Sequence, residues 1–378
     1  MQVIYLISFL FFLPYTALLI YYRQSWLSIP DFKPAVNATP ATKISIIIPA
    51  RNEEENIAAC LDSIIDQNYL THLFEVLVVD DHSVDNTNKI VLRYWDKNVK
   101  LINLKDFVAP GEINSYKKKA IEIAIQQSTG ELIVTTDADC IASNNWLSTI
   151  AAFYEERKPE FIVMPVAINS SSRFIEIFQS LDFMTLQGIT GASVHKKIHS
   201  MCNGANLAYT KKAFIAVDGF KGIDKIASGD DMLLLHKIYT RYPDGIAYLK
   251  SKDVVIQTQP VHSVGQFFNQ RIRWASKADK YDDKRIFLVL LLVYFFNVWI
   301  LALGIGAFFF PIALHLIILL IAKMIVELLF LFPVASFFNN TKLLWLFPIA
   351  QPFHVLYTVI AGWLGKFGSY QWKERKVS

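Results

Sequence analysis

The sequence has few cysteines and little net charge, and each shortage excludes a class of protein. Its three cysteines, Cys60, Cys140 and Cys202, are too scattered for a disulfide framework and form no CxxC or Cys/His metal spacing. They indicate a reducing compartment. The formal net charge is only +4 over 378 residues, whereas proteins that bind nucleic acid concentrate lysine and arginine far more strongly. No nucleic-acid partner is expected.

Hydrophobic residues are abundant, at 53% of the chain, and their surplus lies at its two ends. Residues 1–22 carry no charged side chain, and a helix of that length crosses roughly 30 Å of hydrocarbon at about 1.5 Å per residue. The first charge, Arg23, follows the apolar run, whereas a cleavable signal peptide has its positive charge before that run. We therefore predict an uncleaved N-terminal transmembrane helix.

Three further apolar segments lie near the other end, at residues 286–310, 312–332 and 343–364. Pro348 and Pro352 interrupt the third segment, so it is either a crossing or a re-entrant segment, and two to three C-terminal spans are predicted. Lys323 and Glu327 stand at i and i+4 in the second segment, where we predict a structural pair rather than a transport site.

Basic residues flank the apolar ends, at Arg23, at 277–285 and in the tail at 365–378. This pattern suits the anionic headgroups of a cytoplasmic leaflet. We therefore expect an integral protein of the cell inner membrane whose soluble domain is cytosolic. The apolar part is small and lacks internal repeats, which argues against a transporter.

Between the membrane segments, short β-branched runs alternate with amphipathic helical stretches. Strands are predicted at 43–49, 74–79, 99–104 and 131–136, and helices at 54–66, 86–95, 117–127 and 145–156. This alternation is typical of an α/β domain with a mostly parallel sheet covered by helices. In such open sheets ligands bind beyond the carboxyl ends of the strands, so the residues that follow each strand carry the functional signal.

Polar turns follow the first two predicted strands, at Pro49-Ala50-Arg51-Asn52-Glu53 and at 80–87, which reads Asp80-Asp81-His82-Ser83-Val84-Asp85-Asn86-Thr87. Neighbouring carboxylates repel each other, so Asp80 and Asp81 favour a ligand role, such as accepting hydrogen bonds from a base or ribose. The adjacent helix N-termini offer backbone N–H groups to anions. Ser83, Asp85 and Thr87 are instead predicted to cap the following helix.

The fourth predicted strand runs into Asp137-Ala138-Asp139. Residues i and i+2 of an extended chain point the same way, so both carboxylates can face one ligand. Mg²⁺ or Mn²⁺ held against a pyrophosphate takes one or two carboxylates plus phosphate oxygens. A lone DxD is a weak signal because Asp commonly ends strands, but here the neighbouring strand also ends in two aspartates. We therefore favour a metal site over a structural turn.

Two more motifs lie further along the chain. Asp230 and Asp231 precede a predicted helix, where a carboxylate is either an N-cap or a base that removes a proton from an acceptor hydroxyl. Gln270, Arg273 and Trp274 stand at i, i+3 and i+4 of an amphipathic stretch at 263–285, so a helix places them on one face. There Arg273 can hold phosphate and Trp274 can stack on a sugar or base. The alternative is a membrane-surface helix with aromatic and basic anchors, and both interpretations fit different faces.

In their order and combination these motifs resemble those of the family 2 glycosyltransferases, inverting enzymes of the A-type nucleotide-sugar transferase fold, which is Rossmann-like. The similarity runs from about Ile44 to Trp274 and includes the membrane layout. The turns at 48–53 and 79–87 resemble the nucleotide-binding segments, 137–139 the DxD, 203–206 the substrate-pocket segment, and 270–274 the QxxRW motif. Two departures are His82, where glycine is commoner, and Asp230, where glutamate is usual.

The resemblance implies a role for each matching residue. Asp231 is implied as the catalytic base, together with Asp230. Donor binding is implied for Pro49, Ala50, Arg51, Glu53, Asp80, Asp81, Lys117, Asp137 and Ala138. A Mg²⁺ or Mn²⁺ ion is implied at Asp137 and Asp139. Binding of the acceptor or the diphosphate is implied for Asn203, Gly204, Gln270, Arg273 and Trp274.

The expected organisation is a transmembrane helix at 1–22, a linker at 23–42, a glycosyltransferase domain at 43–262, an interface helix at 263–285, membrane segments at 286–364 and a basic tail at 365–378. The expected function is metal-dependent transfer of a hexose from a UDP- or GDP-sugar to a lipid, lipid-linked or glycan acceptor at the cytosolic membrane face. The alternative is a processive polysaccharide synthase. Two or three spans with almost no polar lining make a poor channel for a growing polysaccharide, so transfer to a lipid or lipid-linked acceptor is favoured over it. A non-catalytic membrane protein that binds nucleotide or glycan is a further alternative, but it predicts missing acidic residues, and all of them are present.

Overall fold

The computed structural model describes residues 1–35, 39–109, 111–171, 173–277, 283–367, 370–372 and 375–377. The chain divides into two compact units. The sheet unit comprises Pro30–Asn169 and Ser200–Gln259, and the helical unit comprises Met1–Ile29, Ser170–His199 and Pro260–Ser378.

The sheet unit is built on a seven-stranded sheet in the order β3-β2-β1-β4-β7-β5-β8. Its strands are β1 (Ile44–Ala50), β2 (Phe74–Asp80), β3 (Val99–Asn103), β4 (Leu132–Thr135), β5 (Phe161–Val163), β7 (Leu207–Thr210) and β8 (Ile246–Tyr248). All neighbouring pairs are parallel except those of β7, which is antiparallel to both β4 and β5. The prediction of a mostly parallel sheet is confirmed, with one reversed strand inside it.

The register of the central strands places the candidate site. Ala50 on β1 pairs with Asp80 on β2, and Ile47 pairs with Thr135 on β4. The turns that follow these strands therefore meet at one edge of the sheet. Helix α4 (Tyr116–Gln127) packs on β1 and β2, because its apolar face is buried on this sheet while its first turn stands at the same edge.

The other helices of the sheet unit are α2 (Ile57–Ile65), α3 (Thr87–Val91), α5 (Trp146–Arg157), α7 (Lys211–Ala216) and α8 (Met232–Arg241). Among them, α2, α5 and α8 lie close to their predicted positions, α3 covers the first half of its predicted range, and α7 was not predicted. A separate parallel pair joins β6 (Val166–Ile168) to β9 (Ile256–Thr258). These two short strands lie just before the two points where the chain passes into the helical unit.

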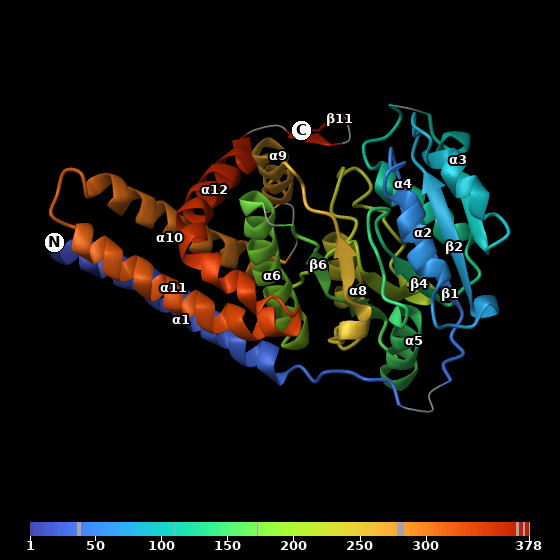
Figure 1. Ribbon diagram of the computed structural model, residues 1–378, viewed down its shortest axis with the longest axis horizontal. Helices are drawn as coiled ribbons and strands as arrows, with labels where there is room; N and C mark the ends of the chain where they lie inside the picture. The colour runs from blue at the N-terminus through green and yellow to red at the C-terminus, as the bar shows by residue number, and fades with distance from the viewer. Residues whose placement is uncertain are drawn as a thin grey trace. The chain divides into compact units, whose positions relative to one another are not determined.

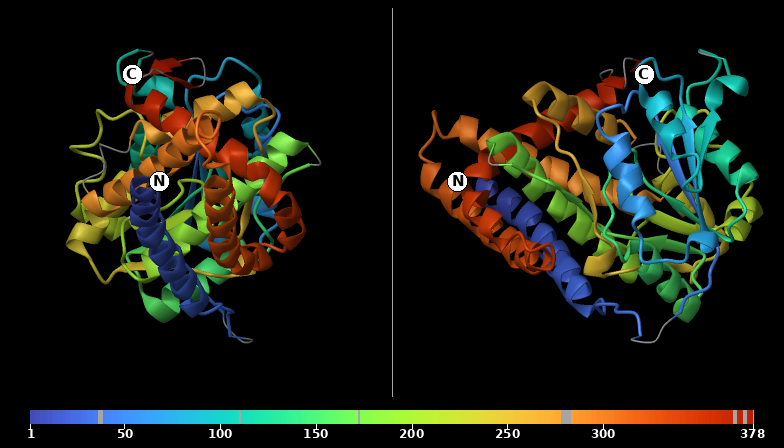
Figure 2. Two further views of the ribbon diagram at one scale, coloured as in Figure 1. Left: turned by 90° about the vertical axis from the view of Figure 1, so that its left-hand side faces the viewer. Right: turned by 45° about the vertical axis from the view of Figure 1, so that its right-hand side comes forward.

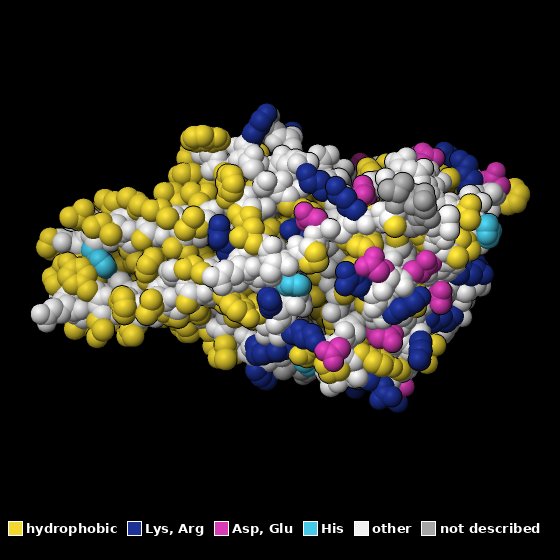
Figure 3. All heavy atoms as spheres, turned by 90° about the horizontal axis from the view of Figure 1, so that it is seen from below, with side chains coloured by type: hydrophobic (Ala, Val, Ile, Leu, Met, Phe, Trp, Pro, Cys, Tyr) yellow, Lys and Arg dark blue, Asp and Glu magenta, His cyan; other side chains and the backbone are white. Residues whose placement is uncertain are grey.

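The helical unit contains α1 (Gln2–Ser28), α6 (Phe174–His195), α9 (Val264–Ala275), α10 (Lys284–Gly306), α11 (Ala313–Phe337) and α12 (Phe347–Phe367). Four helical stretches in the described part of the chain are long and apolar enough to cross a membrane: Gln2–Ser28, Lys284–Gly306, Ala313–Phe337 and Thr341–Phe367. Helix α12 is continuous through Pro352, so the prolines do not break the third C-terminal segment. Figure 3 shows hydrophobic side chains covering most of the visible surface of these helices.

Helix α1 runs beside α6 and α11 (Figures 1 and 2). It buries a polar stripe in which Ser8, Tyr15 and Tyr22 recur at intervals of seven residues. Ser8 Oγ lies 2.8 Å from Nε2 of His315, and the Tyr22 hydroxyl lies 2.8 Å from Nε2 of His199. These specific partners make α1 a structural part of the helical unit rather than an interchangeable anchor.

Tyr15, the middle residue of this stripe, contacts the predicted charged pair of α11, Lys323 and Glu327. Lys323 Nζ lies 2.5 Å from Oε1 of Glu327 and donates to Oε1 of Gln351 at 2.9 Å. Gln351 Nε2 donates to Glu327 at 2.6 Å, and the Tyr15 hydroxyl donates to the same carboxylate. The pair is therefore confirmed, and it joins three helices in a hydrogen-bonded network of buried side chains.

Residues 170–199, which contain α6, lie within the predicted glycosyltransferase domain at 43–262 and are grouped with the helical unit. Helix α6 includes Asp182 and Gln179, both almost fully buried. Their partners lie on α9, on α12 and in the segment at 260–263. The predicted domain boundaries stay predictions.

Candidate active site

The turns after β1 and β2 are joined by reciprocal hydrogen bonds between backbone and side chains. The backbone N–H groups of residues 52, 53 and 54 donate to side chains of the second turn: Asn52 to Ser83 Oγ at 3.0 Å, Glu53 to Thr87 Oγ1 at 2.8 Å, and Glu54 to Asp85 Oδ2 at 3.0 Å. Ser83, Asp85 and Thr87 therefore brace the opposite turn. Hydrogen bonds, the strongest from Thr87, outweigh the effect of burial and lower the pKa of Asp85.

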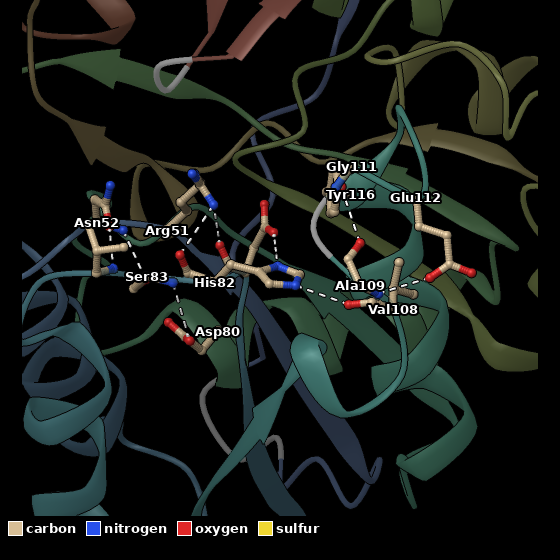
Figure 4. Close-up of polar contacts among 12 residues, drawn as sticks. Arg51, Asn52, Asp80, His82, Ser83, Val108, Ala109, Gly111, Glu112 and Tyr116 are labelled. Atoms are coloured by element: carbon tan, nitrogen blue, oxygen red, sulfur yellow. Dashed lines mark hydrogen bonds and ion pairs between the residues drawn. The ribbon is translucent and has the colours of Figure 1, made fainter.

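Arg51, Asp80 and Asp81 lie at the centre of the two turns that follow β1 and β2. Arg51 Nη1 donates to the backbone carbonyl oxygens of Asp81 at 2.8 Å and His82 at 3.3 Å (Figure 4). Asp80 and Asp81 are each only 4% exposed. Asp80 Oδ2 accepts from the backbone N–H of Ser83 at 3.4 Å, and its buried Oδ1 has no hydrogen-bond partner among the described residues. A buried carboxylate oxygen in this state is ready to accept a ligand hydrogen bond.

Lys117, on the first turn of α4, connects two acidic motifs. Its Nζ lies 2.7 Å from Oδ1 of Asp137 and 3.4 Å from Oδ2 of Asp230, and its side chain is 21% exposed. Burial alone would lower the pKa of Lys117, but the carboxylates of Asp137 and Asp230 raise it above its ordinary value. Lys117 therefore stays a cation between the DxD and the second acidic pair.

Asp231 begins helix α8 and also holds Gly204. Its Oδ1 accepts from the backbone N–H of Met232 at 2.7 Å, and its Oδ2 accepts from the backbone N–H of Gly204 at 3.1 Å. A methyl group added at Gly204 would stand 3.2 Å from Oδ2 of Asp230 and 3.4 Å from Lys117 Nζ. Asp231 is thus the N-cap that one interpretation predicted, and it lies in the same cluster as Lys117 and Asp230.

The remaining predicted residues of the sheet unit take more structural positions. Ala50 and Ala138 are buried, and Glu53 accepts from Asn56 Nδ2 at 3.0 Å. Asn203 Oδ1 accepts from the backbone N–H of Ala205 at 2.9 Å and so shapes the turn that carries Gly204. Pro49 lies on β1, one residue before the edge of the sheet.

The DxD residues suit a divalent cation by their chemistry. Asp137 is 38% exposed at its side chain, and Asp139 Oδ2 accepts from Thr258 Oγ1 at 3.3 Å. The described residues contain no group of three or more His, Cys, Asp or Glu side chains arranged for a metal ion. Two carboxylates completed by phosphate oxygens are the usual protein share of a Mg²⁺ site, so these residues fit a metal that arrives with a phosphorylated ligand.

Gln270, Arg273 and Trp274 lie on α9 of the helical unit, where Arg271 is the best-fixed residue. Arg271 is 4% exposed, and its Nη2 lies 2.7 Å from Oδ2 of Asp182 on α6. Its guanidinium lies 4.1 Å from the centre of the Trp274 ring. One face of Trp274 is therefore covered by Arg271, which limits stacking of a ligand to what the rest of the ring presents.

Two further residues, at the start of α4 and after β2, were not predicted as site residues. Lys118 is 2% exposed, and its Nζ donates to backbone carbonyl oxygens in the loop that leads to Asp230. His82 makes contacts with both ring nitrogens. The departure of His82 from the usual glycine was a signal, whereas nothing in the sequence separates Lys118 from its neighbouring lysines.

Comparison with known proteins identifies similar families and folds. The family described as glycosyl transferase family 2 matches residues 45–217, and that described as glycosyl transferase family group 2 matches residues 132–360. Glycosyltransferase AglE of Haloferax volcanii is 35% identical over 104 residues, which cover 28% of this chain and 33% of AglE. The diphosphoundecaprenol β-1,3-glucosyltransferase WfgD of Escherichia coli is 35% identical over 101 residues, covering 26% of this chain and 35% of WfgD.

The matches span about a third or less of the length of the first curated relatives. A structural comparison covers far more. The mannosyltransferase PcManGT of Pyrobaculum calidifontis, in complex with GDP-Man and Mn²⁺, superposes with a TM-score of 0.58 and 20% identity over 94% of this chain and 97% of that chain. This likeness concerns the fold, and it confirms the predicted A-type nucleotide-sugar transferase architecture with its long apolar helices.

Proposed function

Since the chain belongs to glycosyl transferase family 2, we propose that it transfers a hexose from a nucleotide sugar to a lipid or lipid-linked acceptor at a membrane surface. The observation that carries this proposal is the cluster at one edge of the sheet, where Lys117 joins Asp137 to Asp230 and Asp231 holds Gly204. Carboxylates of two separate motifs converge there around one cation. Structural roles alone give little reason to gather that much charge in one place.

The donor would bind along the edge formed by the turns after β1 and β2. Asp80 offers its buried Oδ1 as an acceptor for a base or ribose hydroxyl, and Arg51 fixes the backbone of the turn beside it. Asp137 and Asp139 would hold Mg²⁺ or Mn²⁺. Such an ion offsets the charge that develops on a departing nucleoside diphosphate. The complex of PcManGT with GDP-Man and Mn²⁺ supports this assignment.

Asp231 is the proposed base. Its two backbone hydrogen bonds fix the orientation of the carboxylate, and each oxygen keeps a further lone pair for an acceptor hydroxyl. Removal of that proton would let the hydroxyl attack the sugar from the face opposite the diphosphate, which inverts the anomeric centre. Gln270, Arg273 and Trp274 on α9 are proposed to contact the diphosphate and the acceptor.

A lipid-type acceptor is favoured by the four apolar helices of the helical unit. The names of two relatives add support, since WfgD acts on a diphosphoundecaprenol-linked sugar and a mouse relative is named dolichyl-phosphate β-glucosyltransferase. The inner membrane and a cytosolic site remain part of the proposal, based on the basic residues that flank the apolar ends.

The test uses the full chain in detergent with Mg²⁺ or Mn²⁺, a panel of UDP- and GDP-sugars and a membrane lipid extract. We expect metal-dependent release of nucleoside diphosphate together with a new glycolipid, and loss of both in Asp139→Ala. Asp231→Asn keeps a carbonyl oxygen for the helix cap, so donor binding is expected to persist while turnover falls by about 10²- to 10⁴-fold. The matched control is Asp224→Asn, because Asp224 is exposed in the preceding loop.

Three results would contradict parts of this proposal. Substantial turnover by Asp231→Asn would remove the base assignment. A ladder of polymer products without added lipid would replace single transfer by processive synthesis. Absence of any nucleotide-sugar binding by the unaltered chain would overturn the transferase function itself.

A further inference from the structure

His82 has an unusual backbone conformation beside the proposed donor site. Its φ of +55° lies in the left-handed region, which residues other than glycine enter rarely and which asparagine, aspartate and histidine enter more readily than most. The side chain lies between the turn after β2 and the segment that follows β3 (Figure 4). A histidine at this position is therefore explained by what its side chain contacts.

Both ring nitrogens of His82 face oxygen acceptors. Nδ1 lies 3.0 Å from Oδ1 of Asp81, and Nε2 lies 3.0 Å from the backbone carbonyl oxygen of Val108. The ring of Tyr116 packs perpendicular to the ring of His82, with 5.7 Å between the two ring centres. Asp81 is 4% exposed and Val108 is 5% exposed, so water has little access to either contact.

The two contacts together require one more proton than a neutral histidine and an ionised aspartate carry. A backbone carbonyl only accepts, and an ionised carboxylate only accepts, so a neutral imidazole with a single N–H can satisfy one of them. Both are satisfied when the ring carries two protons. They are also satisfied when Asp81 itself is protonated and donates to Nδ1. In either form one shared proton links Asp81, His82 and Val108.

We propose that His82 is a positioning residue of the donor site, which holds Asp81 and Val108 in place through this shared proton. The inference rests on the proposed function, because Asp81 is a proposed donor-binding residue. Loss of the proton as the pH rises leaves His82 able to hold only one of its two partners. Donor binding therefore weakens at higher pH, while the chemical step is unchanged.

The charged and titratable groups around His82 are compatible with this proton. Arg51 contacts the backbone carbonyl of His82, whereas Asp80 and Asp81 supply negative charge from the same turn. On the other side, the Tyr116 hydroxyl accepts from the backbone N–H of Gly111, and Glu112 accepts from the backbone N–H of Ala109 at 2.9 Å. Hydrogen bonds thus join Ala109 to Glu112 and Gly111 to Tyr116, and His82 connects the neighbouring Val108 to the aspartate pair.

The test compares donor KM and kcat over about pH 5.5 to 8.5, a range that brackets the titration of histidine side chains. His82→Gly removes both contacts but adopts the left-handed backbone without strain, so the variant is expected to fold. We expect its donor KM to be about tenfold higher at low pH and to lose its pH dependence, with kcat within about twofold. His82→Asn keeps the backbone conformation but not the doubly protonated ring, and the same result is expected.

The matched control is His72→Asn, since His72 is an exposed histidine of the same unit. Its donor KM is expected to rise with pH just as in the unaltered chain. Equal donor KM values for His82→Gly and the unaltered chain at every pH would overturn the proposal. A fall in kcat without a change in KM would overturn it too, because that pattern belongs to the catalytic step.

A second measurement does not need the donor and therefore separates this inference from the proposed function. In protein labelled with ¹⁵N-histidine, the resonances missing from the His82→Asn spectrum identify the His82 ring. Ring nitrogens that both show attached protons at low pH, or a proton shared with Asp81, support the proposal. A ring in a single neutral tautomer with ionised Asp81 across the whole range overturns it, whether or not any nucleotide sugar binds.

Discussion

Replacement of Lys118 by methionine gives the sharpest test of how the acidic pair is held. Lys118 is 2% exposed on α4, and its Nζ donates three hydrogen bonds at 2.7, 2.6 and 3.1 Å. The acceptors are the backbone carbonyl oxygens of Ile223, Ile226 and Ser228. These residues belong to the loop that leads directly to Asp230 and Asp231, so the lysine anchors the approach to the proposed base.

The expected loss of stability in Lys118→Met follows from these three hydrogen bonds. A hydrogen bond from a charged donor contributes about 1.5 to 3 kcal/mol, and the loss is partly offset because the variant no longer buries an ammonium group. We expect a net loss of about 2 to 4 kcal/mol in the free energy of unfolding. For a unit of this size the melting temperature would fall by about 5 to 15 °C.

Melting is followed by intrinsic fluorescence of the full chain in detergent, and turnover is measured on the same samples below the transition. We expect kcat to fall at least about tenfold, with a smaller change in donor KM, because the loop carries the acidic pair rather than the donor edge. Lys119→Met is the matched control. Its side chain is 38% exposed and pairs with Glu122 at 2.8 Å, a surface contact that contributes about 0.5 kcal/mol or less. Equal melting temperatures and equal kcat for the two variants would refute this account of Lys118.

Two further predictions concern the helical unit. Hydrogen bonds from Ser171 lower the pKa of Glu176 from 4.5 to about 2. The ionised Glu176 therefore stabilises the fold above pH 4.5, and this stabilisation is lost as the pH falls toward 2. Glu176→Gln should reduce the loss of stability over this pH range, and an unchanged loss would contradict the assignment. Lys323→Met leaves the buried carboxylate of Glu327 without its cation, so the free energy of unfolding should fall by about 3 to 5 kcal/mol, measured through the melting temperature. The double variant with Glu327→Leu should recover part of that stability. No recovery would contradict the ion-pair explanation.

The sheet edge could be predicted from the sequence because local patterns determine it. The β-branched runs place β1 and β2 within about a residue of their observed bounds, and parallel pairing then brings their C-terminal turns together. Asp80, Asp81 and the DxD follow from this logic alone. The reversed strand β7 could not be predicted, because its place between β4 and β5 depends on pairing between distant segments.

Long-range partners also explain why other features were missed. Lys117, Lys118 and Lys119 are consecutive in sequence, yet they contact the DxD, the loop at 223–228 and the half-buried Glu122 respectively. Helical rotation separates their directions, but only the packing of α4 decides which direction is buried. Arg271 was overlooked beside Arg273 for the same reason, since its partner Asp182 lies on a helix far away in the sequence.

The polar stripe of α1 has a consequence for the order of synthesis. Tyr15 is separated by 312 residues from Glu327, the carboxylate to which it donates. At roughly 5 to 20 residues per second, about 15 to 60 s pass between the emergence of the two side chains from the ribosome. During this interval Ser8 already has a hydrogen-bond acceptor, since its hydroxyl also donates to the carbonyl of Ile4 within the same helix. The Tyr15 hydroxyl gains its acceptor Glu327 only after α11 has been made, so this contact of α1 forms late in synthesis.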